Sequence, residues 1–301
     1  MSAQAGFFAR FLIYQKERFP ILAHGVLISA FTFSAMAYSN ICRGASESFA
    51  ATDFLKAFLN TFFIFFLLRI SDEFKDKDYD RLNRPHLPVP RGLVSLSELR
   101  KLGYLVFVLI TSFNLLFAFS HLYVYIFVLF YMALMYREFF LGHWLLDRPL
   151  WYVVSHMMII PLVDTLASSF DWMGYSPDVK GLFWFFAVSF FNGCTLELGR
   201  KIKAEENEEA NAYSLSLGFE RALAIFQVVL LITFLLCEAA ATYAGLTFVH
   251  HLIFVLLYVL CAGYGFYFRN TRTVRNAKWF ERLSGIWAVL MYLNLGTGLF
   301  F

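Results

Sequence analysis

The chain contains long runs of apolar residues without a charged side chain. The longest, residues 102–136, has no Asp, Glu, Lys or Arg in 35 residues. A helix needs about 20 mostly apolar residues to cross the roughly 30 Å of hydrocarbon in a bilayer. Because 35 residues exceed one crossing, this run predicts two helices that separate near Ser120 and His121.

The other apolar runs, treated in the same way, predict nine transmembrane helices in total. We therefore expect an all-α, polytopic membrane protein in which residues 1–301 form a single integral membrane domain. The predicted spans are residues 19–42, 52–70, the two halves of 102–136, 149–169, 180–197, 222–243, 247–268 and 283–301.

The composition excludes several other classes of protein. Apolar residues make up 59% of the chain and charged residues 16%, against about 25% charged residues in an ordinary soluble domain. A disordered chain is excluded, and a soluble globular enzyme is a poor interpretation. The net charge of +3 does not indicate a nucleic-acid partner. The expected partner of the apolar surface is the lipid bilayer.

The Lys and Arg residues predict the orientation, because cytoplasmic loops are enriched in both. With the N-terminus inside, 22 of the 25 basic residues fall on the cytoplasmic side, and only Arg43, Lys56 and Lys180 fall outside. We therefore expect a multi-pass protein whose N-terminus and long polar loops are cytoplasmic.

The first loop of unusual composition follows the second span. Asp72, Asp76 and Asp80 recur at intervals of four residues, which on one continuous helix places three carboxylates along one stripe. Like charges at this spacing repel one another and weaken a helix unless a cation compensates them. Carboxylate oxygens suit Mg²⁺, which usually shares its shell with substrate phosphates. The spacing therefore favours a magnesium site. Neutralisation by the flanking Lys75, Lys77 and Arg81 and a solvated charged loop are the alternatives.

A rigid basic turn follows the aspartates. Three prolines between Arg84 and Arg91 stop the helix and stiffen the chain. Ser95 and Glu98 have the spacing of a capping box that opens the third span. Guanidinium groups held on such a turn could bind phosphate oxygens through paired hydrogen bonds.

A second charged segment ends the sixth span. Glu197, Lys201 and Glu205 repeat the four-residue interval. Both segments lie at the inner end of an even-numbered span, four spans apart. This pattern resembles an internal duplication, with helices 1–4 and 5–9 as two pseudo-repeated halves whose acidic segments, 72–80 and 197–205, face each other. A solvated charged loop is the alternative interpretation of the second segment.

Two ionisable residues fall inside the fifth predicted span. Asp164 is a functional candidate because ionisable groups at membrane depth are rare and usually functional. It could orient an acceptor, accept a proton, or lie in water at the outer interface. His156 is expected to be a packed, hydrogen-bonded residue.

These features resemble the UbiA superfamily of intramembrane prenyltransferases. That family has nine helices, an N-D-x-x-D-x-x-x-D motif and then Arg-Pro after the second helix, and another acidic motif after the sixth. Aligned at Arg84-Pro85, residues 72–80 read Asp-Glu-Phe-Lys-Asp-Lys-Asp-Tyr-Asp, with Asp72 and Glu73 in place of Asn and Asp. Lys201 replaces an aspartate of the second motif. The resemblance covers nearly the whole chain.

The resemblance implies an enzyme that ionises an isoprenyl diphosphate and transfers the prenyl group to an acceptor, releasing diphosphate. It implies that Mg²⁺ is the cofactor and that a UbiA-like bundle carries a cytoplasm-facing active site. The metal ligands would be Asp72, Asp76, Asp80, Glu197 and Glu205. The diphosphate ligands would be Arg84, Arg91, Arg200 and Lys201.

Two alternatives stay open. A UbiA-type terpene cyclase would ionise the same substrate but cyclise the cation without an acceptor. A membrane transporter or scaffold without catalysis could use the duplicated acidic pattern to bind a cation.

Overall fold

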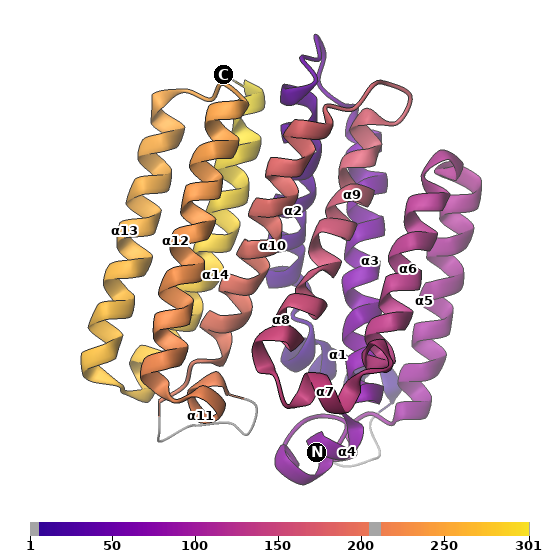
Figure 1. Ribbon diagram of the computed structural model, residues 1–301. Helices are drawn as coiled ribbons and strands as arrows, with labels where there is room; N and C mark the ends of the chain where they lie inside the picture. The colour runs from indigo at the N-terminus through magenta and orange to yellow at the C-terminus, as the bar shows by residue number, and fades with distance from the viewer. Residues whose placement is uncertain (1–5, 205–211, 301) are drawn as a thin grey trace.

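The structure, a computed structural model, describes residues 6–204 and 212–300. Within these ranges the chain is all-α and contains no strand, and nine of its helices are long and apolar enough to cross a membrane. This confirms the predicted fold class and the predicted number of spans. The nine helices stand side by side in one bundle (Figure 1).

Each predicted span corresponds to one crossing in the structure. Two crossings combine shorter elements, and the last crossing ends in a short 3-10 turn. The crossings are α2 (Ile21–Cys42), α3 (Ala51–Lys75), α5 (Leu96–Phe117), η1 with α6 (Phe119–His121, Leu122–Tyr136), α8 with α9 (Pro149–Met157, Ile159–Trp172), α10 (Val179–Lys201), α12 (Phe219–Tyr243), α13 (Phe248–Thr271) and α14 with η4 (Val274–Gly296, Thr297–Phe300).

The short helices that are not part of a crossing gather at one end of the bundle, which we call the loop end. They are α1 (Phe7–Arg18), α4 (Lys77–Asn83), η2 (Glu138–Phe140), α7 (Gly142–Leu146) and α11 (Tyr213–Leu217). Figure 1 shows α1, α4, α7 and α11 at the same end, beyond the long helices. Both charged segments of the sequence therefore lie at the loop end, outside the long apolar stretches.

Local sequence explains where the helices break. The uncharged run of residues 102–136 divides at Ala118–His121, as predicted. The fifth crossing breaks at Met158, between α8 and α9. Pro161 follows within the first turn of α9, and a proline lacks the N–H that would continue the ladder and clashes with the carbonyl four residues earlier. The predicted capping box is confirmed, since the Ser95 side chain accepts from the Glu98 N–H and the Glu98 carboxylate from the Ser95 N–H.

The bundle core brings the two charged segments together. The helices α2 and α9 each contact both α3 and α10, the two helices that end in those segments. Buried polar pairs cross between helices, as between Asn60 and Asn114 at 2.7 Å. At Gly199 the helices α10 and α14 approach so closely that an added Cβ would lie 2.6 Å from the Ser284 Cβ. This packing fixes the ends of α3 and α10 beside each other.

Candidate active site

The first acidic segment does not form one continuous helix. The helix α3 ends at Lys75, and Asp76 joins it to α4 with backbone angles of φ −92° and ψ 6°. The backbone N–H of Asp76 still donates to the Asp72 carbonyl at 2.9 Å, and that of Asp80 to the Asp76 carbonyl at 2.8 Å. The prediction of a single helical stripe is wrong, because the chain bends where the middle of three mutually repelling carboxylates lies.

Asp72 and Asp76 line a polar cavity of about 430 Å³ at the loop end. The Asp72 side chain is 44% exposed and lies 3.6 Å from the Arg69 guanidinium. The Asp76 carboxylate is half-buried and accepts no hydrogen bond from the described part of the chain. Burial raises the pKa of Asp76, and the nearby charges of Asp72 and Asp80 raise it further, against the lowering effect of Lys75. A cation bound here would favour its ionised form.

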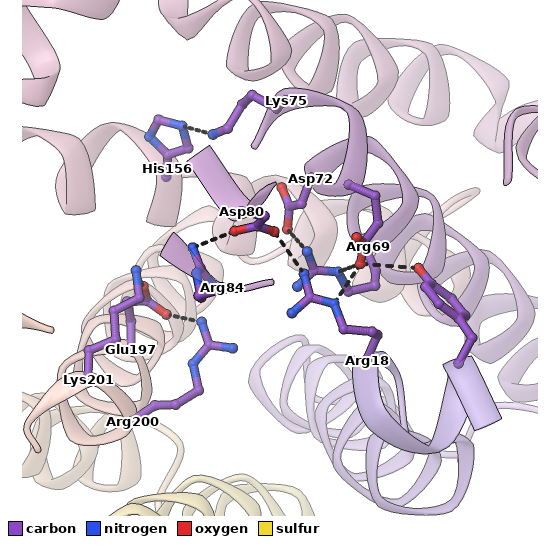
Figure 2. Close-up of polar contacts among 12 residues, drawn as sticks. Arg18, Arg69, Asp72, Lys75, Asp80, Arg84, His156, Glu197, Arg200 and Lys201 are labelled. Atoms are coloured by element: carbon purple, nitrogen blue, oxygen red, sulfur yellow. Dashed lines mark hydrogen bonds and ion pairs between the residues drawn. The ribbon is translucent and has the colours of Figure 1, made fainter. Parts of the chain in front are cut away.

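Asp80 does not itself line this cavity. Its Oδ1 lies 2.9 Å from Arg84 Nη2, and its Oδ2 lies 3.7 Å from Arg18 Nη2. Figure 2 shows the two guanidinium groups approaching Asp80 from two sides. Asp80 is almost fully buried, so the two arginines compensate its charge. The structure thus brings two of the three predicted aspartates to the cavity.

Glu73 holds the N-terminal helix against this segment. It is buried, and its Oε1 accepts from Arg18 Nε at 2.6 Å and from the Tyr14 hydroxyl at 3.4 Å. Sequence reasoning gave Glu73 no role of its own. The signal was present, because Glu73 follows the buried positions Leu67 and Ile70 at helical spacing and so belongs to the inward face of α3.

The second charged segment reaches the same cavity from α10. Glu197 Oε1 lies 2.6 Å from Lys201 Nζ, and its Oε2 lies 2.6 Å from Arg200 Nη2. The Lys201 ammonium also lies 5.4 Å from the centre of the Tyr213 ring. Glu197 is therefore already compensated by two cations. Glu205, the remaining predicted ligand, lies outside the described residues.

Charge in the cavity lining is weighted toward cations. Seven basic side chains line it against five carboxylates, so the protein surface alone attracts an anion. The basic residues are Arg18, Arg69, Lys75, Arg84, Arg200, Lys201 and Lys203, and the acidic residues are Glu17, Asp72, Asp76, Glu197 and Glu281. Three of the four predicted diphosphate ligands, Arg84, Arg200 and Lys201, are among them.

Arg91, the fourth predicted diphosphate ligand, does not reach the cavity. Its guanidinium donates to both carboxylate oxygens of Glu17 at 2.8 Å and to the His86 carbonyl at 2.6 Å. This pair, like that of Arg18 with Glu73, attaches α1 to the first segment. The sequence alone could not indicate this pairing, because the partner of Arg91 lies 74 residues earlier in the chain.

The fit of a metal ion can be judged from these donors. Among the described residues, no group of three or more His, Cys, Asp or Glu side chains is arranged to hold a metal. Two carboxylates at the cavity, Asp72 and Asp76, nevertheless suit Mg²⁺, which is commonly bound by one or two carboxylates together with substrate phosphates. The unpartnered carboxylate of Asp76 is the observation that fits such an ion. Glu197 does not fit, since Lys201 and Arg200 engage both of its oxygens.

Three further residues of the cavity wall were not predicted as site residues. Lys75, Tyr152 and His156 line it together, and Figure 2 shows Lys75 directed toward His156. His156 is buried and hydrogen-bonded, as expected, but it is also part of the site. Lys75 and His156 lie 81 residues apart in the chain. The local sequence around either residue therefore could not indicate that they meet.

An apolar cavity of about 110 Å³ lies further into the bundle. Its lining includes Leu196, while the next residue, Glu197, lines the polar cavity, so the two spaces adjoin along α10. Phe31, Phe65 and Tyr292 supply aromatic walls. A charged group could thus occupy the polar cavity while an attached apolar chain enters the bundle.

Asp164 lies on α9 and is completely buried. In the described part of the chain, neither its carboxylate oxygens nor the Ser189 hydroxyl makes a hydrogen bond of good geometry, although Asp164 and Ser189 lie close enough to interact. The alternative of a water-exposed Asp164 at the outer interface is therefore wrong. Asp164 does not line either cavity.

The fold and site define a class of protein: an intramembrane bundle in which two charged segments flank one polar cavity that adjoins an apolar one. The chain belongs to the UbiA prenyltransferase family, whose sequence model matches residues 17–295. A comparison with curated proteins finds no match.

Two solved structures share the fold. A UbiA homologue from Aeropyrum pernix K1, solved in its apo form, has a TM-score of 0.66 at 14% identity and covers 92% of this chain and 97% of its own. A structure described as digeranylgeranylglyceryl phosphate synthase has a TM-score of 0.61 at 13% identity and covers 97% of this chain and 99% of its own. At these identities the likeness concerns the fold alone.

Proposed function

We propose that this protein is a Mg²⁺-dependent enzyme that transfers a prenyl group from an isoprenyl diphosphate to an acceptor and releases diphosphate. The observation that carries the proposal is the pairing of a cation-rich polar cavity with an adjoining apolar cavity. A prenyl diphosphate has the same division, with a highly charged head on an apolar chain. Membership of the UbiA prenyltransferase family supports the same reaction class.

In this proposal, Asp72 and Asp76 hold one Mg²⁺ together with the diphosphate oxygens. Bound there, the ion would stabilise the negative charge that develops as the carbon–oxygen bond breaks. Asp80 has an indirect role, because its pairing with Arg84 holds that guanidinium at the cavity. Any metal-binding role of Glu205 stays a prediction.

Basic residues on the other segment bind the leaving group. Arg200 and Lys201 reach the cavity from α10, and Glu197 orients both of them at 2.6 Å. Lys201 takes the place of an aspartate in the second family motif, so it contributes a positive charge there in place of a metal ligand. A single metal ion and the lysine ammonium then share the charge of the diphosphate.

The prenyl chain occupies the apolar cavity, where its allylic cation would be excluded from water. The faces of Phe31 and Phe65 can stabilise such a cation through cation–π attraction. A role of Asp164 in orienting the acceptor or shaping the pocket stays a prediction, since this buried residue of α9 lines neither cavity. The loop end is proposed to face the cytoplasm, as the distribution of basic residues predicts.

Product analysis tests this function and separates it from the alternatives. Purified protein is incubated with geranyl, farnesyl and geranylgeranyl diphosphate and MgCl₂, without an acceptor, and the diphosphate and organic products are measured. A transferase gives diphosphate in quantity only when an acceptor is added. A cyclase gives a hydrocarbon or terpene alcohol without one. A transporter or scaffold releases no diphosphate under either condition, and this result would refute the proposal.

A further inference from the structure

Four side chains form a compact cluster in and behind one wall of the polar cavity. Lys75 is the last residue of α3, Glu138 begins η2, and Tyr152 and His156 lie on α8. The Lys75 Nζ lies 2.7 Å from the Tyr152 hydroxyl, 3.0 Å from Glu138 Oε1 and 3.3 Å from His156 Nε2. The Tyr152 and His156 rings stack with centroids 3.9 Å apart. The position of each side chain is therefore fixed by several contacts.

The hydrogen bonds define which nitrogen of His156 carries no proton. Its Nδ1 lies 2.9 Å from the Tyr152 carbonyl oxygen, which can only accept, so the neutral ring carries its proton on Nδ1. The Nε2 is then unprotonated and accepts from the Lys75 ammonium. This leaves a basic nitrogen in a residue that lines the cavity.

Glu138 lies where it could interact with His156 once Nε2 carries a proton. Its Oε2 is buried and faces His156 Nε2 at 3.4 Å, without the alignment of a hydrogen bond. A buried carboxylate oxygen without a donor is unfavourable. The imidazolium form of His156 would direct an N–H toward that oxygen.

The backbone that carries Glu138 is strained. Glu138, Phe139 and Phe140 have positive φ angles of 48°, 54° and 59° in succession. For residues other than glycine, this left-handed region is sterically unfavourable. Such strain persists only where surrounding structure imposes it, and it is common at functional sites. Here it places Glu138 behind His156.

We propose that His156 is the proton acceptor of the prenyl transfer and that Glu138 and Lys75 position it. This inference rests on the proposed function. The prenyl carbon–oxygen bond breaks and its electron pair leaves with diphosphate, while an electron pair of the acceptor forms the new bond to carbon. The proton lost by the acceptor moves to His156 Nε2, which gives up its hydrogen bond from Lys75, while the ammonium keeps Tyr152 and Glu138 Oε1 as partners. The new N–H faces Glu138 Oε2, and solvent later removes the proton. The acceptor is therefore a nucleophile that carries a proton on its attacking atom.

The test compares two probe nucleophiles with geranyl diphosphate and MgCl₂. Methanol must lose a proton to give geranyl methyl ether, whereas azide gives geranyl azide without losing one. General base catalysis typically contributes about 10²–10⁴-fold. We expect His156→Gln to lower ether formation about 100-fold and azide formation less than threefold. Glu138→Gln should lower ether formation about tenfold and leave azide formation unchanged, which a merely structural role would not do.

A matched control is the other histidine–glutamate pair. His251 Nδ1 lies 2.5 Å from Glu238 Oε2. Glu238 lies in the last two turns of α12 and His251 in the first turn of α13, so the pair is remote from the loop end, where α12 begins. His251→Gln should leave both products unchanged.

The inference is overturned if His156→Gln lowers both products in parallel, if it lowers neither, or if wild-type protein releases diphosphate but forms no ether. A wild-type protein that releases no diphosphate from any prenyl chain would instead refute the proposed function, and the inference with it.

Discussion

Replacing Glu73 by glutamine should loosen the N-terminal helix from the rest of the protein. Glu73 is buried and accepts from Arg18 at 2.6 Å and from Tyr14 at 3.4 Å. Removing one partner of a buried ion pair costs about 3–5 kcal/mol. Glutamine keeps an acceptor oxygen, and a neutral hydrogen bond is about half as strong as a charge-assisted one. About 2 kcal/mol is then lost, which shifts the docking equilibrium of α1 about 30-fold.

Hydrogen exchange of the peptide that covers residues 7–18 measures this shift in detergent. We expect its protection to fall about 30-fold in Glu73→Gln. The control is Glu17→Gln on α1 itself, because the Glu17–Arg91 pair is 38% and 35% exposed and such pairs contribute at most about 1 kcal/mol. Equal losses in the two variants, or unchanged protection in Glu73→Gln, would contradict the account of how α1 is held.

Two further predictions concern packing and pH. In Gly199→Ala the new Cβ would lie 2.6 Å from the Ser284 Cβ. The free energy of unfolding should therefore fall by about 1–3 kcal/mol, and the midpoint of thermal unfolding should fall with it. Gly263→Ala is the control, because nothing lies within 4 Å of its added Cβ and its midpoint should not fall. Equal midpoints in the two variants would refute the close approach at Gly199. The guanidinium of Arg91 lowers the pKa of Glu17 below its ordinary value of 4.5. The small stabilisation by this pair is therefore complete above about pH 4.5 and is lost as the pH falls through the lowered pKa. The difference in α1 protection between wild type and Glu17→Gln should disappear on acidification, and a difference that grows would contradict this sign.

The fold was predictable from the sequence because one physical constraint dominates it. A backbone in hydrocarbon must satisfy its own hydrogen bonds, so each long uncharged run forms a helix, and length alone divides residues 102–136 into two. The break at Met158 was not predicted. Pro161 was visible in the sequence, but neighbouring helices decide whether such a residue bends a span or ends it.

The candidate site was predictable in part. Asp72, Asp76, Arg84, Arg200 and Lys201 line the polar cavity, because each lies at the inner end of a predicted span and the spans had to bring those ends to one side. Local spacing identified these residues without knowledge of their partners.

The residues that escaped sequence reasoning depend on α1 or on distant segments. Asp80 and Arg91 turn toward Arg18 and Glu17, which belong to a helix that the hydropathy pattern did not resolve. Spacing along the chain cannot show which cation neutralises which carboxylate, since the partners lie 62 and 74 residues apart. Three-dimensional packing decides that question.

Diphosphate release from a prenyl diphosphate is the most direct test of the central claim. Wild type, Asp76→Asn and Asp78→Asn are compared with MgCl₂ and with EDTA, using geranyl diphosphate and the acceptor or probe nucleophile that supports turnover. Asp78 is an exposed carboxylate two residues from Asp76 and does not line the cavity, so its variant controls for the loss of charge. The account predicts release that EDTA abolishes, that Asp76→Asn lowers at least about 100-fold and that Asp78→Asn leaves unchanged. Release that persists in EDTA, or that falls equally in both variants, would contradict it.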